Sequence, residues 1–245
     1  MREWIFGRNA VFEVLRANRR QSFQLQIAQG VEEKGRLVEI LQLCQVRRIP
    51  ITRVPRQQLE SIHPGHQGVM LQTSGYPYVS LPDILDRVGT AQKQPLLLIL
   101  DALQDPQNLG TLLRTAEVVG VSGVLLPLRH TVTITPTVVN VASGACEHLL
   151  VAQSNLAQSI ATLKSQGIWV VGLAGEFTNA TPDSRLLSSP LALVVGNEGE
   201  GLRQLVRQSC DQLWSLPMQG KIESLNAAVA GSIALYFVWQ ARGYA

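Results

Sequence analysis

Three glycines lie close together directly after an apolar run in the last third of the chain. Residues 191–195, LALVV, have the length of a buried strand, and Gly196, Gly199 and Gly201 follow at once. Glycine tolerates positive φ and lets backbone N–H groups come close to a ligand, because it has no Cβ. The segment therefore predicts a ligand-binding turn, although a plain glycine turn gives the same pattern.

The order of these glycines is G-x-x-G-x-G, which is not the G-x-G-x-x-G fingerprint of dinucleotide-binding folds. The phosphate-binding pattern G-x-x-x-x-G-K-[ST] is also absent from the sequence. A Rossmann or P-loop assignment thus lacks its signature.

A second turn follows a short predicted strand at residues 213–218. Pro217 and Gly220 end that strand, and Ser224 then stands where a helix is expected to begin. Ser224 has the side chain of an N-cap, which places Asn226 in the first turn of the helix. A cap with no further role gives the same pattern. The helix is rich in small residues, which predicts close packing against a neighbouring element.

The composition indicates a globular protein of one or two domains, with 245 residues, 46% of them hydrophobic, and a mean hydropathy of +0.12. No apolar run reaches transmembrane length and the first 20 residues lack the apolar core of a secretion signal, so we expect a cytoplasmic protein without a membrane segment. Cys44, Cys146 and Cys210 show no C-x-x-C spacing, so we expect no disulfide framework and no metal site.

The net charge of +3 is concentrated in the first third of the chain. Its basic residues are mostly arginine, whose planar guanidinium suits phosphate contacts and base stacking. They are Arg2, Arg8, Arg16, Arg19, Arg20, Arg47, Arg48, Arg53 and Arg56. The pattern fits RNA or DNA binding and an ordinary solvated surface equally well.

Residues 1–75 are expected to form a small α/β domain. Periodicity predicts helices at 7–18 and 33–45, strands at 24–28, 49–54 and 66–72, and a helical turn at 57–62. Residues 76–94 are rich in proline, glycine and polar side chains, so they are predicted to be a linker with one short helix.

Residues 95–245 are expected to form a second α/β domain. It opens with a buried strand at 96–100, after which Asp105 and Pro106 have the cap-then-proline pattern of a helix start. Arg114 lies off the apolar stripe of that helix, where a surface arginine beside Glu117 is the simplest interpretation. Further strands are predicted at 123–126, 148–152 and 169–173, and helices at 138–145 and 156–166. This alternation predicts a mostly parallel sheet with helices on both faces.

Three segments of this domain resemble the three ordered motifs of the SpoU, or TrmH-like, family of RNA ribose 2′-O-methyltransferases in the SPOUT superfamily. They read LDALQDPQNLGTLLRTAEVVGVSGVLLP, LALVVGNEGEGLR and LWSLPMQGKIESLNAAVAGSIALY. The first domain, with GRNAVFEVL and HQGV, is similar to the L30e-like substrate-binding domain of some members. Members with this layout include enzymes that methylate a 23S ribosomal RNA guanosine at the 2′ oxygen.

The resemblance implies a trefoil-knotted parallel-sheet domain, S-adenosylmethionine as cofactor, and a homodimer whose interface borders the site. In the family, backbone groups at the positions of Gly196, Leu216 and Leu225 hold the cofactor. The polar active-site positions match Asn108, Arg114, Glu198, Ser224 and Asn226.

A ribose hydroxyl is a poor nucleophile, so the site must accept its proton or stabilise the alkoxide that develops. In the mechanisms proposed for the family, the residue at the position of Arg114 accepts the proton of the ribose hydroxyl. An arginine that is always charged suits stabilisation of the alkoxide better. We expect Asn108, Ser224 and Asn226 to orient Arg114 and the ribose, and Glu198 to fix Arg114 or the loop, or to act as the alternative base.

Other interpretations stay open on sequence alone. The same chemistry on another 23S position, as in antibiotic-resistance enzymes, or on transfer RNA fits the motifs equally. A non-catalytic RNA-binding or ribosome-assembly protein would share the fold. A small-molecule nucleotide enzyme would leave the arginine-rich first domain unexplained.

Overall fold

The structure is a computed structural model that describes residues 2–91, 94–175, 183–222 and 224–244. The chain divides into two compact units. The first comprises Met1–Pro77 and Thr133–His148, and the second comprises Tyr78–Val132 and Leu149–Ala245. The first unit is therefore built from two separate stretches of sequence.

The first unit contains a four-stranded sheet in the order β1 (Arg2–Phe6), β4 (Val69–Ser74), β2 (Ser22–Ala28), β3 (Ile51–Val54). β4 runs antiparallel to β1 and β2, whereas β2 and β3 are parallel. The helices from this part of the sequence are α1 (Arg8–Ala17), α2 (Arg36–Val46) and α3 (Arg56–Ile62).

These elements agree with the predicted ones except for β1, which the sequence analysis missed. Only Ile5 and Phe6 are buried in this strand. The local apolar pattern is therefore weak, and β1 depends on its full register with β4, from Arg2 opposite Ser74 to Phe6 opposite Met70.

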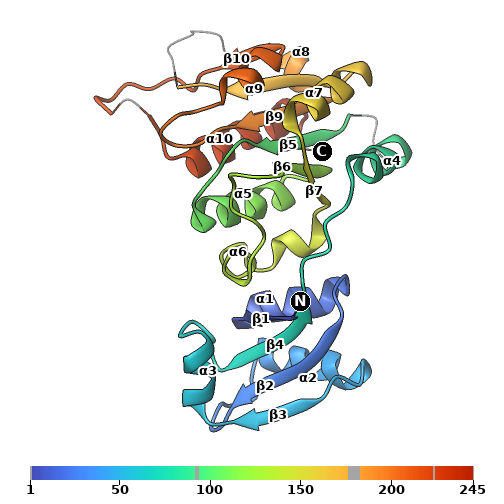
Figure 1. Ribbon diagram of the computed structural model, residues 1–245, viewed down its shortest axis with the longest axis vertical. Helices are drawn as coiled ribbons and strands as arrows, with labels where there is room; N and C mark the ends of the chain where they lie inside the picture. Colours follow the sequence, from blue (N-terminus) through green and yellow to red (C-terminus); the bar gives the residue numbers. More distant parts are fainter. Residues whose placement is uncertain (1, 92–93, 176–182, 223, 245) are drawn as a thin grey trace. The chain divides into compact units, whose positions relative to one another are not determined.

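The second unit contains a six-stranded sheet in which all strands are parallel (Figure 1). Its order is β10 (Gln212–Trp214), β8 (Trp169–Leu173), β9 (Leu191–Val195), β5 (Leu96–Leu100), β6 (Gly123–Pro127), β7 (Val151–Ser154). Every residue of β5, β6 and β9 is buried, as is typical of parallel strands covered on both faces. The parallel α/β fold expected for this part of the chain is confirmed.

Helices pack on both faces of this sheet. α4 (Leu81–Ala91), α7 (Leu156–Ser165) and α9 (Gln204–Ser209) share one apolar core with it. On the other face, α10 (Ala227–Ala241) lies against α5 (Pro106–Val118) and β9, so closely that a Cβ on Gly231 would stand 2.5 Å from Leu112 and 3.1 Å from Val195. The small residues of α10 thus allow close packing, as predicted. A short helix, α8 (Ser184–Leu187), precedes β9.

No helix in the described part of the chain has both the length and the apolar character needed to cross a membrane.

The structure corrects the predicted start of α10. The Asn226 side chain accepts hydrogen bonds from the backbone N–H groups of Ala228 and Val229, so Asn226 is the N-cap and the predicted cap at Ser224 is wrong. The preceding strand β10 ends at Trp214, four residues earlier than predicted. An exposed asparagine and an exposed serine have similar cap preferences, so local sequence could not decide between them.

The helix predicted at 138–145 is also wrong in part. The structure has α6 (Pro136–Val141) and a separate 3₁₀ helix, η1 (Ala145–His148). Between them, Ser143 and Gly144 adopt left-handed backbone conformations, with φ of 52° and 84°. A Cβ on Gly144 would stand 2.5 Å from the Cβ of Glu13, so this turn depends on glycine to let α1 approach.

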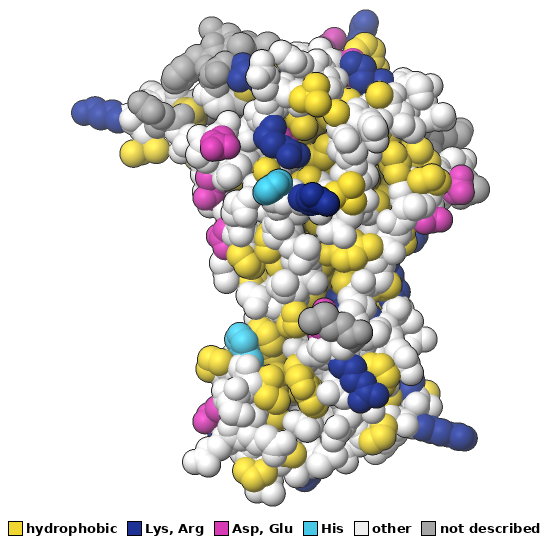
Figure 2. Space-filling model, in the orientation of Figure 1, with side chains coloured by type: hydrophobic (Ala, Val, Ile, Leu, Met, Phe, Trp, Pro, Cys, Tyr) yellow, Lys and Arg dark blue, Asp and Glu magenta, His cyan; other side chains and the backbone are white. Residues whose placement is uncertain are grey.

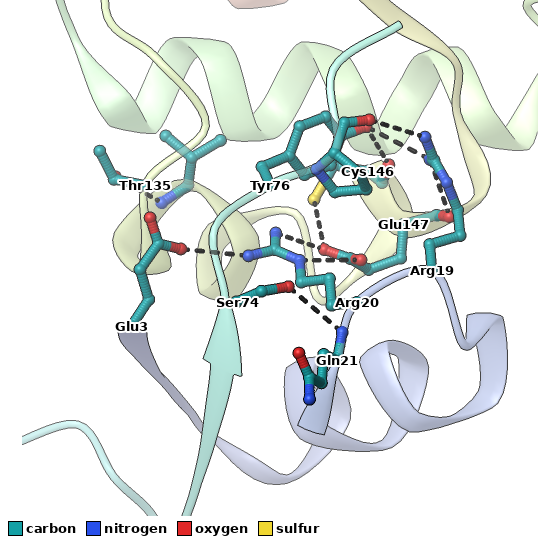
Figure 3. A network of polar contacts seen from close by, with 11 residues as sticks. Glu3, Arg19, Arg20, Gln21, Ser74, Tyr76, Thr135, Cys146 and Glu147 are labelled. Carbon is teal, nitrogen blue, oxygen red and sulfur yellow. Dashed lines mark hydrogen bonds and ion pairs between the residues drawn. The ribbon is translucent and has the colours of Figure 1, made fainter. Parts of the chain in front are cut away.

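A buried ionic network holds Thr133–His148 in the first unit (Figure 3). The Arg20 guanidinium donates to Glu147 Oε1 and Oε2 at 2.6 and 3.1 Å and to Glu3 Oε2 at 3.1 Å. The Tyr76 hydroxyl donates to the Cys146 carbonyl at 2.8 Å, and Arg19 Nη1 to the Glu147 carbonyl at 3.2 Å. The network therefore joins segments of the first unit that are far apart in the sequence.

Candidate active site

A pocket of about 550 Å³ lies at the carboxyl ends of β8, β9 and β10. Its walls are the segments 173–175, 195–202 and 214–216, each of which begins at the last residue of one of these strands, together with the region before α10 and its first turn. Ligands of open parallel sheets bind at this edge, and the volume lies in the usual range of about 300–1,000 Å³ for small-molecule sites. The position and size of the pocket both indicate a cofactor or substrate site.

The loop after β9 forms one wall of this pocket. Asn197 and Gly201 exchange backbone N–H···O hydrogen bonds of 3.0 and 2.9 Å, which close the loop on itself. Gly201 has a φ of 67°, in the left-handed region. A Cβ on Gly196 would stand 2.3 Å from the carbonyl carbon and oxygen of Gly201, so a side chain at 196 would force the loop to move.

Three polar side chains from distant parts of the second unit meet beside the pocket. Asn108 on α5 donates from Nδ2 to Glu198 Oε1 at 2.6 Å. Asn226 donates from Nδ2 to the same Glu198 oxygen and to Asn108 Oδ1, the latter at 3.1 Å. Because Asn226 Oδ1 caps α10, its amide nitrogen is turned toward Glu198 and Asn108. The helix start thus orients the amide that holds the Glu198 carboxylate.

The other predicted site residues are placed as follows. Gly196, Leu216, Ser224 and Leu225 all line the pocket. Arg114 lies on the exposed side of α5, less than two turns after Asn108, and is outside the lining of the pocket. The structure therefore brings together seven of the eight predicted residues around the pocket, and it places Arg114 on the same helix as Asn108.

The sequence analysis missed several residues of the lining. Leu173 ends β8, Ala174 and Gly175 follow it, and all three line the same pocket as the loop after β9. The rule that ligands bind at carboxyl ends of parallel strands could have found them, because the strand itself was predicted correctly. Arg207 on α9 also lines the pocket, and no motif in the sequence marked it.

The described residues contain no group of three or more His, Cys, Asp or Glu side chains arranged to bind a metal ion. Burial raises the pKa of the Cys44 and Cys210 thiols to about 11 in each case, and it raises the pKa of Cys146 as well. These thiols stay protonated at neutral pH, so they are poor nucleophiles. The polar side chains in and beside the pocket include two amides, a carboxylate and an arginine.

Comparison with known families supports the sequence resemblance. Residues 95–236 match the SpoU rRNA Methylase family, and residues 4–79 match the family described as RNA 2'-O ribose methyltransferase substrate binding. The two matches together span most of the chain.

Curated relatives agree along nearly the full length. The chain is 41% identical over 98% of its length to the putative TrmH family tRNA/rRNA methyltransferase YacO of Bacillus subtilis, of which it covers 96%. It is 38% identical over 96% of its length to the 23S rRNA (guanosine-2'-O-)-methyltransferase RlmB of Pseudomonas putida, of which it covers 94%.

Solved structures show the same fold. The SpoU methyltransferase AviRb of Streptomyces viridochromogenes, in complex with AdoMet, matches with a TM-score of 0.81 and 20% identity, over 100% of this chain and 92% of that one. The AdoMet-bound rRNA methyltransferase of Sinorhizobium meliloti matches with a TM-score of 0.79 and 25% identity, over 98% and 87% of the two chains. The protein therefore belongs to the SpoU family and is an S-adenosylmethionine-dependent RNA methyltransferase.

Proposed function

We propose that this enzyme methylates the 2′ oxygen of a ribose in RNA and that its substrate is a guanosine of 23S ribosomal RNA. The observation that carries the proposal is the cluster of Asn108, Glu198 and Asn226 at the edge of the strand-end pocket. The Pseudomonas putida relative, which acts on a 23S guanosine by its name, supports the substrate.

The pocket suits S-adenosylmethionine in size and in chemistry. Leu173, Val195 and Leu216 offer apolar surface to an adenine ring, and the backbone of the loop from Gly196 onward offers polar groups to the ribose and the amino acid part. We assign the backbone groups of Gly196, Leu216 and Leu225 to cofactor binding. The bound cofactor supplies the electrophilic methyl group.

In this proposal the polar residues align and activate the ribose. Oε1 of Glu198 accepts hydrogen bonds from both Asn108 and Asn226, so we assign Glu198 to holding the loop and the two amides in place. The permanently charged Arg114 stabilises the 2′ oxygen while the hydroxyl proton passes to solvent or to Glu198, the alternative base, and the oxygen takes the methyl group. Ser224, exposed at the pocket wall, contacts the ribose.

A methyl group added at Gly196 is expected to weaken cofactor binding strongly. Gly196→Ala puts Cβ 2.3 Å from backbone atoms of Gly201, so the loop must open and lose its shape. Gly89→Ala is the matched control, because Gly89 is exposed on α4, lies outside the lining of the pocket, and a Cβ there meets nothing within 4 Å. Calorimetry with S-adenosylmethionine should show weaker binding for the first variant alone, and equal affinities would remove this loop from the cofactor site.

The first unit is proposed to bind the RNA. Arg2, Arg16, Arg48, Arg53 and Arg56 are exposed, and Figure 2 shows lysine and arginine side chains on one face of this unit. Several of these arginines pair with glutamates on the surface, an interaction weak enough to be exchanged for a phosphate.

We do not assign RNA binding to two arginines of the predicted basic set. Arg20 is 4% exposed and is paired with Glu147, and Arg19 donates to the backbone carbonyls of Pro77 and Glu147. Both stabilise the unit from inside.

We also propose that the enzyme is a homodimer that pairs through α10. Val229, Ile233, Tyr236 and Phe237 are 37–46% exposed on this helix. The last three line a shallow hollow of about 300 Å³ together with Ser232, Gln240 and Tyr244. An apolar face of this kind is typical of a subunit interface. Ile233→Asp is expected to give monomers in sedimentation, whereas Ile222→Asp, at an exposed position outside α10, is expected to leave the dimer intact.

Family membership supports two further parts of the proposal, a trefoil knot in the second unit and a cytoplasmic location with the ribosomal RNA. A second RNA substrate deserves a direct comparison, because the Bacillus subtilis relative is named as a tRNA/rRNA methyltransferase. Unmodified 23S and transfer RNA transcripts offered together, with labelled cofactor, would decide between them. We expect label on 23S, and label on transfer RNA alone would overturn that choice.

A further inference from the structure

Asp101 holds both ends of the loop that forms the pocket wall. It follows β5 directly, and its backbone N–H donates to the carbonyl of Val195, the last residue of β9, at 2.8 Å. Its carboxylate binds the other end of the loop. Oδ2 accepts from the backbone N–H of Arg203 at 2.9 Å, and Oδ1 accepts from Arg203 Nε at 2.7 Å.

The Asp101 carboxylate is buried, and burial strengthens these contacts. Asp101 is 0% exposed, and Oδ1 lies 2.6 Å from Nη2 of Arg203, whose side chain is 43% exposed. The guanidinium therefore makes a forked contact through Nε and Nη2 with a single oxygen of a buried anion, while it still reaches solvent. A buried carboxylate is expensive to desolvate without such a partner, so the pair is expected to stay closed.

Arg203 is the N-cap residue of α9 and has no side-chain cap hydrogen bond of its own. The Asp101 carboxylate, directly after β5, accepts the hydrogen bond from the backbone N–H at this helix start. Leu202, 8% exposed, anchors the same end in the core of the sheet. The segment between Val195 and Leu202, which carries Gly196 and Glu198, is thus fixed at each end by one residue that does not itself line the pocket.

We propose that Asp101 is a positioning residue for cofactor binding. By tying Val195 and Arg203 to the end of β5, it keeps the loop in the shape that binds S-adenosylmethionine and keeps Glu198 in contact with Asn108 and Asn226. The inference rests on the proposed assignment of this pocket to the cofactor.

Asp101→Asn tests this role, because it removes the negative charge with almost no change in shape. The dissociation constant and the KM for S-adenosylmethionine are expected to rise at least about tenfold, the factor that corresponds to about 1.4 kcal/mol. The dissociation constant for RNA is expected to stay at the wild-type value. Arg203→Lys keeps the charge and the backbone N–H but loses the forked contact, so its affinity for S-adenosylmethionine should lie between those of wild type and Asp101→Asn. This variant tests the same pair if Asp101→Asn fails to fold.

Arg242→Ala is the control for a purely structural effect in the same unit. Arg242 follows α10 and donates to the carbonyls of Leu187, Gln94, Pro95 and Ser189, away from the pocket. Its loss should lower the melting temperature and leave cofactor affinity unchanged. Asp101 would have no positioning role if Asp101→Asn bound the cofactor as tightly as wild type. The same would follow if Asp101→Asn and Arg242→Ala had equal melting temperatures and lost equal amounts of cofactor affinity.

The failure of the two proposals can be told apart. If wild-type protein binds S-adenosylmethionine but Gly196→Ala leaves the affinity unchanged, the pocket assignment itself is wrong. If Gly196→Ala weakens binding and Asp101→Asn does not, only the role of Asp101 fails.

Discussion

Arg114→Ala is expected to lower the methyl-transfer rate by about 100- to 1,000-fold, the usual loss when one group that stabilises a developing oxyanion is removed. The affinity for S-adenosylmethionine should stay unchanged, because Arg114 lies outside the lining of the pocket. Single-turnover transfer of labelled methyl to RNA measures the rate, and calorimetry measures the affinity.

Arg185→Ala is a suitable control, since Arg185 is an exposed arginine on α8. It should transfer methyl at the wild-type rate. Arg114→Lys separates the charge from the arginine fork, and we expect it to lose most of the activity because a lysine cannot make two parallel contacts. Near-normal turnover with lysine would show that any cation at this position suffices.

Glu147→Ala is expected to lower the free energy of unfolding by about 3–5 kcal/mol, because it leaves the Arg20 guanidinium buried without its main counter-ion. Arg20 is 4% exposed and Glu147 is 0% exposed. Burial alone acts to lower the pKa of Arg20, but the charge and hydrogen bonds of Glu147 together raise it, so Arg20 stays charged. Urea denaturation followed by circular dichroism gives the change.

The exposed pair of Arg56 and Glu60 provides the comparison for this loss. Both side chains are about half exposed, so Glu60→Ala should change the stability by less than about 1 kcal/mol. Replacing both buried partners, as in Arg20→Met with Glu147→Leu, should recover much of the stability lost by Glu147→Ala. An unchanged urea midpoint for Glu147→Ala would contradict the importance of this network.

Local patterns predicted much of the second unit correctly. The apolar runs of β5 and β9 gave the strands, and Asp105 before Pro106 gave the start of α5, where the Asp105 side chain accepts from Gln107 N as an N-cap should. The three glycines after β9 pointed to a loop that needs glycine. Gly201 has a positive φ, and Gly196 lies too close to the Gly201 backbone to carry a Cβ.

Contacts between distant residues could not be predicted in this way. Asp101 and Arg203 are 102 positions apart, and neither stands in a pattern that predicts a partner. Likewise, Glu147 lies between a predicted helix and a predicted strand of the second domain, yet its carboxylate pairs with Arg20 in the first unit. Such pairs depend on how the chain folds back on itself, which periodicity does not record.

The domain division 1–75, 76–94 and 95–245 stays a prediction. The network around Arg20 implies that a fragment ending at Pro77 would keep Glu3 but lack Glu147, the main counter-ion of this arginine. Fragment boundaries for future experiments should therefore keep the segment Thr133–His148 with the first unit.

The most direct test of the central claim is transfer of labelled methyl from S-adenosylmethionine to unmodified 23S transcript, followed by mapping of the modified nucleotide. We expect label at the 2′ oxygen of one guanosine, seen as a bond resistant to alkaline cleavage, and almost no label with Arg114→Ala. Label on a base instead of a ribose, or equal labelling by wild type and Arg114→Ala, would contradict the central claim.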